Sequence, residues 1–274
     1  MEQEALIRTD AAARPIVLCA DDYGYSPGVS SGIRELLVQG RISATSCMVV
    51  YPEFDREGPL LKPFADRADI GLHFTLTADR SATSLMRDAY LRRLRAGHIA
   101  DALDRQLAAF VRTMGTAPDY IDGHQHVHLL PGVRDVVTAT AQKLGIYVRS
   151  TREPIDLSMA LRPSFVESAF LSWTARPLEK LIRKRKLTTN CGFRGVRGFR
   201  ERAAYRSLFQ RMIADVRAGS IVMCHPGFAD GVLAARDPIT DAREEELRYF
   251  ASDEFLQDLA KENLTLARLR DALA

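Results

Sequence analysis

One stretch decides the fold of this chain: Pro15-Ile16-Val17-Leu18-Cys19-Ala20-Asp21-Asp22. It begins as an apolar, β-branched run, which is typical of a buried strand, and it ends in two adjacent carboxylates where that strand should surface. Two carboxylates this close repel each other unless a cation or a reacting proton lies between them. The pair therefore indicates that chemistry takes place at the end of this strand.

Further apolar runs follow and alternate with amphipathic stretches, which is the pattern of βα units and a parallel sheet. We expect strands at residues 16–20, 44–50, 69–74, 120–123, 146–149, near 188, at 220–225 and at 264–266. The clearest helices are predicted at residues 132–144, 100–114 and 201–217, where apolar residues recur at helical spacing. This alternation predicts the α/β class.

The length and composition limit the organisation of the chain. Its 274 residues, of which 46% are hydrophobic, can bury one large core, and (β/α) barrels reach this size as single domains. We therefore expect a single domain over 1–274, with a loose segment at 1–14 and an insertion at 150–200 that covers the active-site face. The net charge of +3 is too balanced to indicate a nucleic-acid-binding protein.

No secretory or membrane signal is evident. Residues 1–14 carry acidic residues and lack an apolar core, and no run approaches the roughly 20 apolar residues of a membrane span. The four cysteines, Cys19, Cys47, Cys191 and Cys224, form no C-x-x-C pair and are expected to be reduced, buried thiols. We expect a cytoplasmic protein without a transmembrane segment.

Polar residues that could perform chemistry gather at the ends of the predicted strands. They are Asp21, Asp22, His73, His124, His126, His128, Arg149 and His225. Because the carboxyl ends of parallel strands meet at one rim, residues distant in sequence become neighbours there. Five of the six histidines lie at such ends, and His98, expected in a loop, is the exception.

Simpler interpretations exist for each of these residues. The aspartate pair could be a turn that caps a helix beginning near Ser26, and His73 alone could be a hydrogen-bonded, half-buried side chain. The run 124–128 is more specific, because alternate positions of an extended segment point to one side and would present several imidazoles together.

Together the residues fit a divalent metal site with two imidazoles and one carboxylate. Such a site has open positions for water and substrate, lowers the pKa of the water and polarises a carbonyl. One aspartate could then bind the ion while its neighbour takes the proton as general base. The combination favours hydrolysis.

With these residues in these positions, the chain resembles the YdjC-like carbohydrate deacetylases, a family that includes deacetylases of chitooligosaccharides and of hopanoid biosynthesis. Five ordered motifs over nearly the whole chain carry the resemblance. They are Ala20-Asp21-Asp22-Tyr23-Gly24-Tyr25-Ser26, Gly40-Arg41-Ile42-Ser43-Ala44-Thr45-Ser46, Ile70-Gly71-Leu72-His73-Phe74-Thr75-Leu76-Thr77, Asp122-Gly123-His124-Gln125-His126-Val127-His128 and Cys224-His225-Pro226-Gly227.

The resemblance implies an irregular (β/α) barrel of the TIM-barrel type that removes N-acetyl groups from amino sugars with a divalent metal, Zn or Mg. By motif position it implies three metal ligands, Asp22, His73 and His124. It implies further that Asp21 is the general base, that His225 is the general acid, and that Arg149 orients Asp21. The implied substrate is a chitooligosaccharide or a glycolipid-linked N-acetylglucosamine, and the chain would act as a monomer or homodimer.

Two positions depart from the family pattern. Gln125 stands where the family usually has a third histidine, and Gly123 stands where it usually has serine. Neither is assigned to the metal, so the expected chemistry is retained. We expect His126 and His128 to support a ligand or contact substrate.

The basic segment 180–202 and Trp173 each have two interpretations. The segment could make peripheral contact with anionic lipid headgroups or a phosphorylated substrate, or it could be a solvated helix face with an arginine-rich loop, which we favour. Trp173 could stack on a sugar ring together with Phe170, although burial is the commoner fate of a lone tryptophan.

Three other functions remain open. Amidohydrolase and phosphoesterase barrels also use histidine-rich strand ends, but they typically begin with His-x-His on the first strand, where this chain has Asp-Asp. A non-catalytic metal- or carbohydrate-binding protein would need neither Asp21 nor His225. A glycoside hydrolase would need its two carboxylates about 5 Å or more apart across the bond, which adjacent residues of one strand reach poorly.

Overall fold

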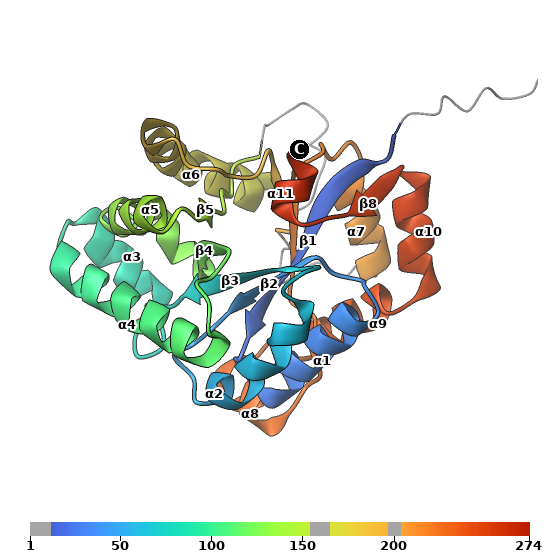
Figure 1. The fold of residues 1–274 in the computed structure, drawn as a ribbon, viewed down its shortest axis with the longest axis horizontal. Coiled ribbons are helices and arrows are strands. Elements are labelled where there is room, and N and C mark those ends of the chain that lie inside the picture. The colour runs from blue at the N-terminus through green and yellow to red at the C-terminus, as the bar shows by residue number, and fades with distance from the viewer. Residues whose placement is uncertain (1–11, 154–164, 197–203) are drawn as a thin grey trace, which may run out of the picture.

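A curled parallel sheet forms the centre of the molecule in the computed structural model, which describes residues 12–153, 165–196 and 204–274 (Figure 1). The strand order is β5-β4-β3-β2-β1-β7-β6, and β8 pairs with the beginning of β1. The strands are β1 (Arg14–Tyr23), β2 (Ala44–Cys47), β3 (Asp69–Phe74), β4 (Tyr120–Gly123), β5 (Tyr147–Val148), β6 (Phe193–Arg194), β7 (Ile221–Cys224) and β8 (Leu264–Leu266).

Helices surround this sheet (Figure 1). They are α1 (Pro27–Val38), α2 (Glu53–Glu57), α3 (Ala82–Tyr90), α4 (Ala96–Met114), α5 (Val133–Leu144), α6 (Phe165–Arg185), α7 (Tyr205–Ile213), α8 (Gly231–Arg236), α9 (Asp241–Phe250), α10 (Asp253–Lys261) and α11 (Leu269–Ala272), with 3-10 turns η1 (Gly58–Phe64) and η2 (His124–Leu129). The helix after β1 begins where Ser26 accepts a hydrogen bond from the Val29 N–H and Pro27 occupies the first turn.

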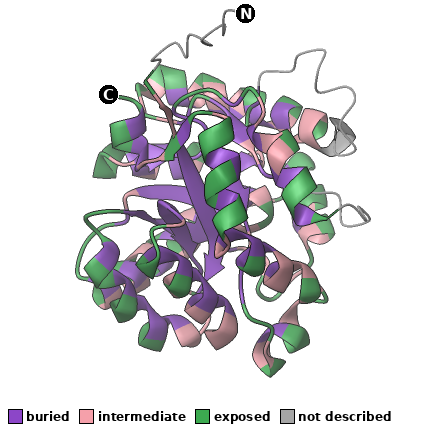
Figure 2. Cartoon of the chain, turned by 90° about the vertical axis from the view of Figure 1, so that its right-hand side faces the viewer, coloured by how far each residue is buried: buried purple, intermediate pink, exposed green. Residues whose placement is uncertain are grey.

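The two faces of the sheet carry two apolar clusters. Strand residues alternate between them: in β1, Ile16 and Leu18 pack in the larger cluster with the helices, whereas Val17 and Cys19 belong to a smaller one. That smaller cluster also takes residues from β2, β4, β5, β6, β7 and α11, so we place it inside the curl of the sheet. The strands are almost wholly buried (Figure 2). Alternation therefore decides which strand residues face the interior.

The expected irregular (β/α) barrel is confirmed as a curled half-barrel with flanking helices. The seven strand pairings within the described residues are all parallel. Strands β5 and β6 are not paired with each other, and residues 188–190 make hydrogen bonds with the end of β5 instead. The Val148 N–H donates to the Thr188 carbonyl at 3.3 Å. The Asn190 side-chain amide accepts from the Ser150 N–H and donates to the Ser150 carbonyl. The weak strand expected near residue 188 is found a few residues later, as β6.

Most predicted elements are present, with shifted ends. The strands predicted at 69–74, 120–123 and 264–266 have the expected bounds, whereas β1 is longer than predicted and β2 and β5 are shorter. The helix predicted at 201–217 is reduced to α7, and residues 197–203 lie outside the described residues.

Two expectations about single residues are wrong. His98 lies in the first turn of α4 rather than in a loop, because the helix begins at Ala96. Cys191 is exposed, whereas Cys19, Cys47 and Cys224 are buried as expected, and all four are free thiols. Within the described residues, no helix has the length and apolar character needed to cross a membrane.

Candidate metal centre

The end of β1 turns two neighbouring carboxylates toward the same place. On a regular strand adjacent side chains point to opposite faces, so Asp21 would follow Val17 and Cys19 inward while Asp22 would face the helices. Instead, the pairing of β1 with β2 shifts between Ala20 and Tyr23, and Asp22 has a φ of 73°. The irregularity directs both buried carboxylates into the site.

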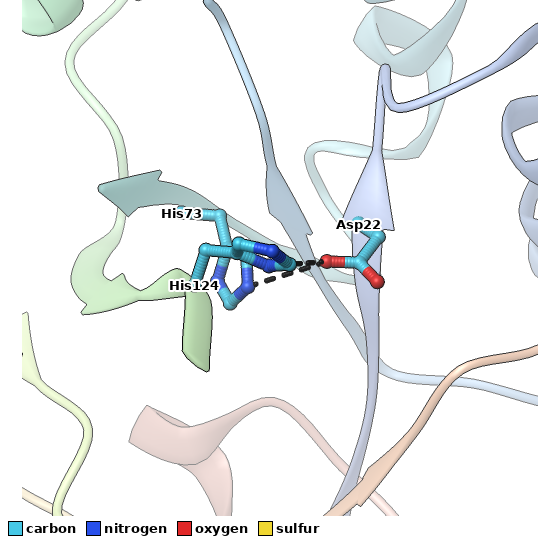
Figure 3. Close-up of side chains that lie close together, drawn as sticks. All are labelled: Asp22, His73 and His124. Carbon is cyan, nitrogen blue, oxygen red and sulfur yellow. Dashed lines mark hydrogen bonds and ion pairs between the residues drawn. The ribbon is translucent and has the colours of Figure 1, made fainter. Parts of the chain in front are cut away.

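Asp22, His73 and His124 converge on one point (Figure 3). The Asp22 Oδ1 atom lies 3.4 Å from the His73 Nε2 atom and 3.1 Å from the His124 Nδ1 atom. Ligand atoms about 2.1 Å from a common ion, at tetrahedral or octahedral angles, are about 3.0–3.4 Å apart. The spacing therefore suits a divalent ion bound by the three residues.

The hydrogen bond of the His73 Nδ1 atom shows whether the other ring nitrogen, Nε2, is free to bind a metal. The His73 Nδ1 atom lies 2.6 Å from the Asp122 Oδ1 atom, and a carboxylate accepts, so Nδ1 carries the proton. The Nε2 lone pair then faces the Asp22 carboxylate, and two acceptors that face each other need a cation between them. Carboxylate–histidine pairs of this kind commonly orient metal-binding imidazoles. The residues present fit a divalent metal.

The electrostatics of His73 and Asp22 lead to the same conclusion. Burial opposes the charged form of His73, but the charges of Asp122 and Asp21 and the hydrogen bonds that the ring donates to Asp122 and Asp22 outweigh it and raise the pKa to about 10. Burial likewise opposes ionised Asp22, yet the charge of Arg243 and the two imidazoles hold its pKa well below the usual range. The site favours a positive charge, either a proton or a metal.

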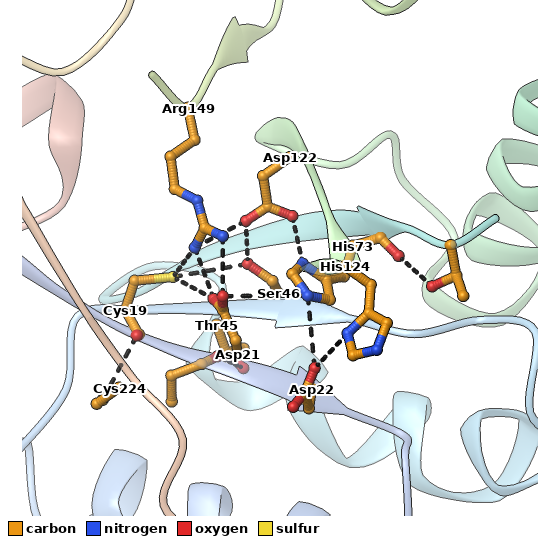
Figure 4. Close-up of polar contacts among 12 residues, drawn as sticks. Cys19, Asp21, Asp22, Thr45, Ser46, His73, Asp122, His124, Arg149 and Cys224 are labelled. Atoms are coloured by element: carbon orange, nitrogen blue, oxygen red, sulfur yellow. Dashed lines mark hydrogen bonds and ion pairs between the residues drawn. The ribbon is translucent and has the colours of Figure 1, made fainter. Parts of the chain in front are cut away.

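Arg149 holds Asp21 beside this centre (Figure 4). Its Nη1 and Nη2 atoms donate to the Asp21 Oδ1 and Oδ2 atoms at 2.6 and 2.8 Å, and Nη1 also lies 2.9 Å from the Asp122 Oδ2 atom. Burial alone would raise the pKa of Asp21, but the Arg149 charge, the His73 charge and these bonds lower it well below its usual range. Asp21 is therefore an ionised carboxylate, 4.0 Å from the His73 Nε2 atom.

A second group, Cys19, Asp21 and Asp122, also has ligand atoms close together. Here Arg149 already supplies the positive charge to both carboxylates, and burial together with the Asp21 charge raises the pKa of the Cys19 thiol. Ser46 donates to the Asp122 Oδ2 atom at 2.6 Å. Arg149 and the Ser46 hydroxyl thus bind the carboxylates of this group, and we assign it no second ion.

The histidine-rich segment is not extended, and this expectation is wrong. Residues 124–129 form the turn η2, in which Gln125 and His126 have φ values of 51° and 57°. The turn lies close to Gly123: a Cβ atom at this position would be 2.9 Å from the His128 backbone nitrogen. Only His124 of the three imidazoles therefore reaches Asp22, and in this conformation a side chain at position 123 would crowd the turn.

His126 and His128 lie behind the centre rather than in it. A backbone carbonyl can only accept, so the His128 Nε2 atom donates to the Arg149 carbonyl at 3.1 Å. His126 packs edge-on against Phe193, with ring centroids 5.9 Å apart. Burial and the charge of Arg149 lower the pKa of His126 to about 3, so its ring is neutral.

His225 follows β7 on the inward side of the sheet, after Ile221 and Met223. It is half-buried, and its backbone N–H donates to the Glu246 Oε2 atom at 2.6 Å. The structure thus brings together five of the predicted residues, Asp21, Asp22, His73, His124 and Arg149, whereas His225 is positioned by its backbone and stays a prediction as a site residue.

Two residues of the centre were missed by sequence reasoning. Asp122 stands two positions after Tyr120 of the inner cluster, so strand alternation could have placed it inward beside His73. Arg243 donates to the Asp22 Oδ2 atom at 2.8 Å from helix α9, and no local pattern indicates this contact. The helix expected to begin near Ser26 is present, and Ser26 rather than either aspartate caps it, so capping does not explain the aspartate pair.

Comparisons with known proteins show the family to which the chain belongs. A family model described as YdjC-like protein matches residues 15–261. A carbohydrate deacetylase of Geobacillus stearothermophilus is 28% identical over 269 residues, which cover 94% of this chain and 98% of that protein. A chitooligosaccharide deacetylase of Serratia marcescens is 29% identical over 236 residues, which cover 80% and 83%.

A solved structure also has the same fold. The crystal structure of an Enterococcus faecalis protein, described provisionally as a cellobiose-phosphate cleavage protein, superposes with a TM-score of 0.70. The superposition covers 95% of this chain and 99% of that protein at 18% sequence identity. At this identity the likeness concerns the fold alone.

Proposed function

The chain belongs to the YdjC-like protein family, and from this premise we propose that it is a metal-dependent carbohydrate deacetylase, which hydrolyses the amide bond of an N-acetylated amino sugar. Relatives named carbohydrate deacetylase and chitooligosaccharide deacetylase support the reaction. One observation carries the proposal: three ligand atoms of Asp22, His73 and His124 converge beside an ionised Asp21.

A divalent ion held by Asp22, His73 and His124 would lower the pKa of water and polarise the acetyl carbonyl. Either Zn or Mg suits two imidazoles and one carboxylate. In this proposal the ligands are fixed before the ion arrives, because Asp122 fixes the His73 ring and Arg243 fixes one oxygen of Asp22.

The chain's own residues move the protons. Asp21 accepts a proton from the attacking water, and Arg149 keeps this carboxylate ionised and aimed. His225 donates a proton to the departing nitrogen, so that acetate and a free amine leave. His128 helps to hold Arg149 in place by donating to its backbone carbonyl. His126 packs edge-on against Phe193, whose ring lies 5.6 Å from the Arg149 guanidinium.

We take the substrate to be a chitooligosaccharide or a glycolipid-linked N-acetylglucosamine, as in hopanoid biosynthesis. The name of the Serratia relative supports the first alternative. We further propose that the protein is cytoplasmic, acts as a monomer or homodimer and forms one domain in which the insertion at 150–200 covers the active-site face. Residues 1–11, 154–164 and 197–203 of the segments named in this expectation lie outside the described residues.

Helix α6 supports the alternative of a lipid-linked substrate. The expected burial of Trp173 is wrong: this side chain is 58% exposed and Phe170 is 55% exposed, with ring centroids 6.5 Å apart. The buried face of α6 carries Ala175, Leu178 and Ile182, while Arg176, Lys180 and Lys184 are exposed. Aromatic and basic side chains on an exposed helix face suit peripheral contact with an anionic lipid surface.

Acetate release tests the function. We expect release from at least one member of a panel of N-acetylated oligosaccharides and glycolipids, abolished by a chelator and restored by Zn²⁺ or Mg²⁺. Non-acetylated sugars serve as the control for contaminating acetate. No release from any member with either metal would contradict the deacetylase, and undiminished release after metal removal would contradict the metal.

A further inference from the structure

Helix α9 reaches the metal centre from the C-terminal part of the chain through Arg243. The Arg243 Nη2 atom donates to the Asp22 Oδ2 atom at 2.8 Å and to the Asp237 Oδ2 atom at 2.9 Å. Its side chain is buried, and among the residues that the structure describes its Nε and Nη1 atoms have no partner. A single nitrogen therefore makes both contacts.

This contact gives the two carboxylate oxygens of Asp22 different partners. The Oδ2 atom accepts from Arg243, while Oδ1 faces the imidazoles of His73 and His124. An aspartate can bind a metal through one oxygen or through both, and the choice changes the number of positions left for water and substrate. With Oδ2 engaged by a cation, only Oδ1 is available.

Arg243 also has little freedom to release Asp22. Asp237 holds the same nitrogen from the chain just before α9, and the Tyr25 ring lies 5.8 Å from the guanidinium and 6.0 Å from the His124 ring. The backbone of α9 holds the loop of His225 as well, because the Gly227 N–H donates to the Arg243 carbonyl. Helix α9 thus contacts both Asp22 and the segment that follows His225.

We infer that Arg243 is a positioning residue that restricts Asp22 to one-oxygen coordination of the metal and so sets the number of open positions and the metal preference of the site. The inference rests on the proposed function, since it assumes that Asp22 binds an ion. Without Arg243, Oδ2 becomes available, and the site gains an oxygen ligand at the cost of an open position. Such a site suits larger, oxygen-preferring ions such as Mn²⁺ better and Zn²⁺ less well.

The test measures metal binding by the full-length apo protein, without turnover. Arg243→Met removes the donor and keeps most of the volume. We expect it to weaken Zn²⁺ binding about 10- to 100-fold, the usual effect of losing a residue that orients a metal ligand, and to weaken Mn²⁺ binding less. The visible absorption spectrum of bound Co²⁺ should change in band shape or intensity, because it reports coordination geometry.

Arg268→Met is the matched control. Arg268 donates to the Asp69 Oδ1 atom at 2.9 Å, and this Arg–Asp pair is also largely buried, but it lies at the first residue of β3 whereas His73 lies near the last. We expect the control to lose stability while keeping the wild-type Co²⁺ spectrum and the wild-type ratio of Zn²⁺ to Mn²⁺ affinity. Arg243→Lys, which keeps the charge and one donor, should restore part of both properties.

The outcomes separate the inference from the function. If Arg243→Met binds Zn²⁺ and Mn²⁺ in the wild-type ratio with an unchanged Co²⁺ spectrum, Arg243 is only structural and the inference is wrong, whatever the wild type hydrolyses. If Arg243→Met does not fold, Arg243→Gln gives the same comparison. A wild-type protein that binds none of these ions would refute the proposed metal site and the inference together.

Discussion

Asp21 and Asp22 differ in their partners although they are neighbours. Asp21 points inward as strand alternation requires and meets Arg149, whereas Asp22 takes a left-handed backbone conformation and meets two imidazoles and Arg243. A non-glycine residue in that conformation costs about 1–2 kcal/mol. Strain of this kind persists where surrounding contacts fix it, and it is frequent at functional sites.

Arg149→Lys should move the acid limb of the pH–rate profile to higher pH. Burial raises the pKa of Asp21, and the two bonds and charge of Arg149 lower it further than burial raises it. Lysine keeps the charge but has a single nitrogen and cannot form the two parallel bonds that Arg149 makes to Asp21, so the pKa of Asp21 should rise. Because the base must be ionised, activity should then be lost at a higher pH as the solution is acidified.

The measurement is kcat/KM as a function of pH, with a thermal melt at each pH to show that the variant remains folded. Arg206→Lys, which alters a bidentate pair with Asp258 between α7 and α10, serves as the control and should leave the profile unchanged. An acid limb at the wild-type position in Arg149→Lys would show that Arg149 does not set the ionisation of the base.

At the scale of elements, the strands place most of the centre by alternation alone. Inward positions at the ends of β1, β3, β4, β5 and β7 lead to Asp21, His73, Asp122, Arg149 and His225. The turn η2 follows a different rule, because two left-handed residues reverse the chain after His124. Alternation therefore accounts for the inward positions of Asp21, Asp122 and Arg149, and fails for Asp22 and for the histidine-rich segment.

Helix α6 should bind anionic vesicles through its exposed face. Trp173 is the only tryptophan of the chain, so its fluorescence reports this face without interference. We expect its emission to shift to shorter wavelength with vesicles that contain an anionic lipid and to shift less as salt is raised. The double variant Lys180→Gln, Lys184→Gln should weaken the shift.

Lys261→Gln is a suitable control, because Lys261 ends α10 on the other side of the molecule from α6 (Figure 1). The Trp173 emission of this variant should shift as much as that of the wild type. An emission maximum that stays fixed with anionic vesicles but moves with N-acetylated oligosaccharides would instead make Phe170 and Trp173 a sugar-stacking surface, and the lipid contact would be rejected.

For the whole molecule, the sequence predicts the parallel α/β architecture and the rim where the polar residues meet. Short-period patterns carry this information, since strand ends and helical spacing are local. The contact from Arg243 to Asp22 joins positions 221 residues apart and leaves no local signal. The bulge of β1 and the turn η2 were likewise missed, because no regular period marks left-handed Asp22, Gln125 and His126.

The division of work between the two aspartates is the central claim, and bound metal measured together with acetate release tests it. Asp21→Asn should retain the metal content of the wild type while kcat falls about 100- to 10,000-fold, as expected for loss of a general base. Asp22→Asn should lose the metal after dialysis. Near-wild-type acetate release by Asp21→Asn, or loss of its metal while Asp22→Asn keeps the ion, would contradict the account.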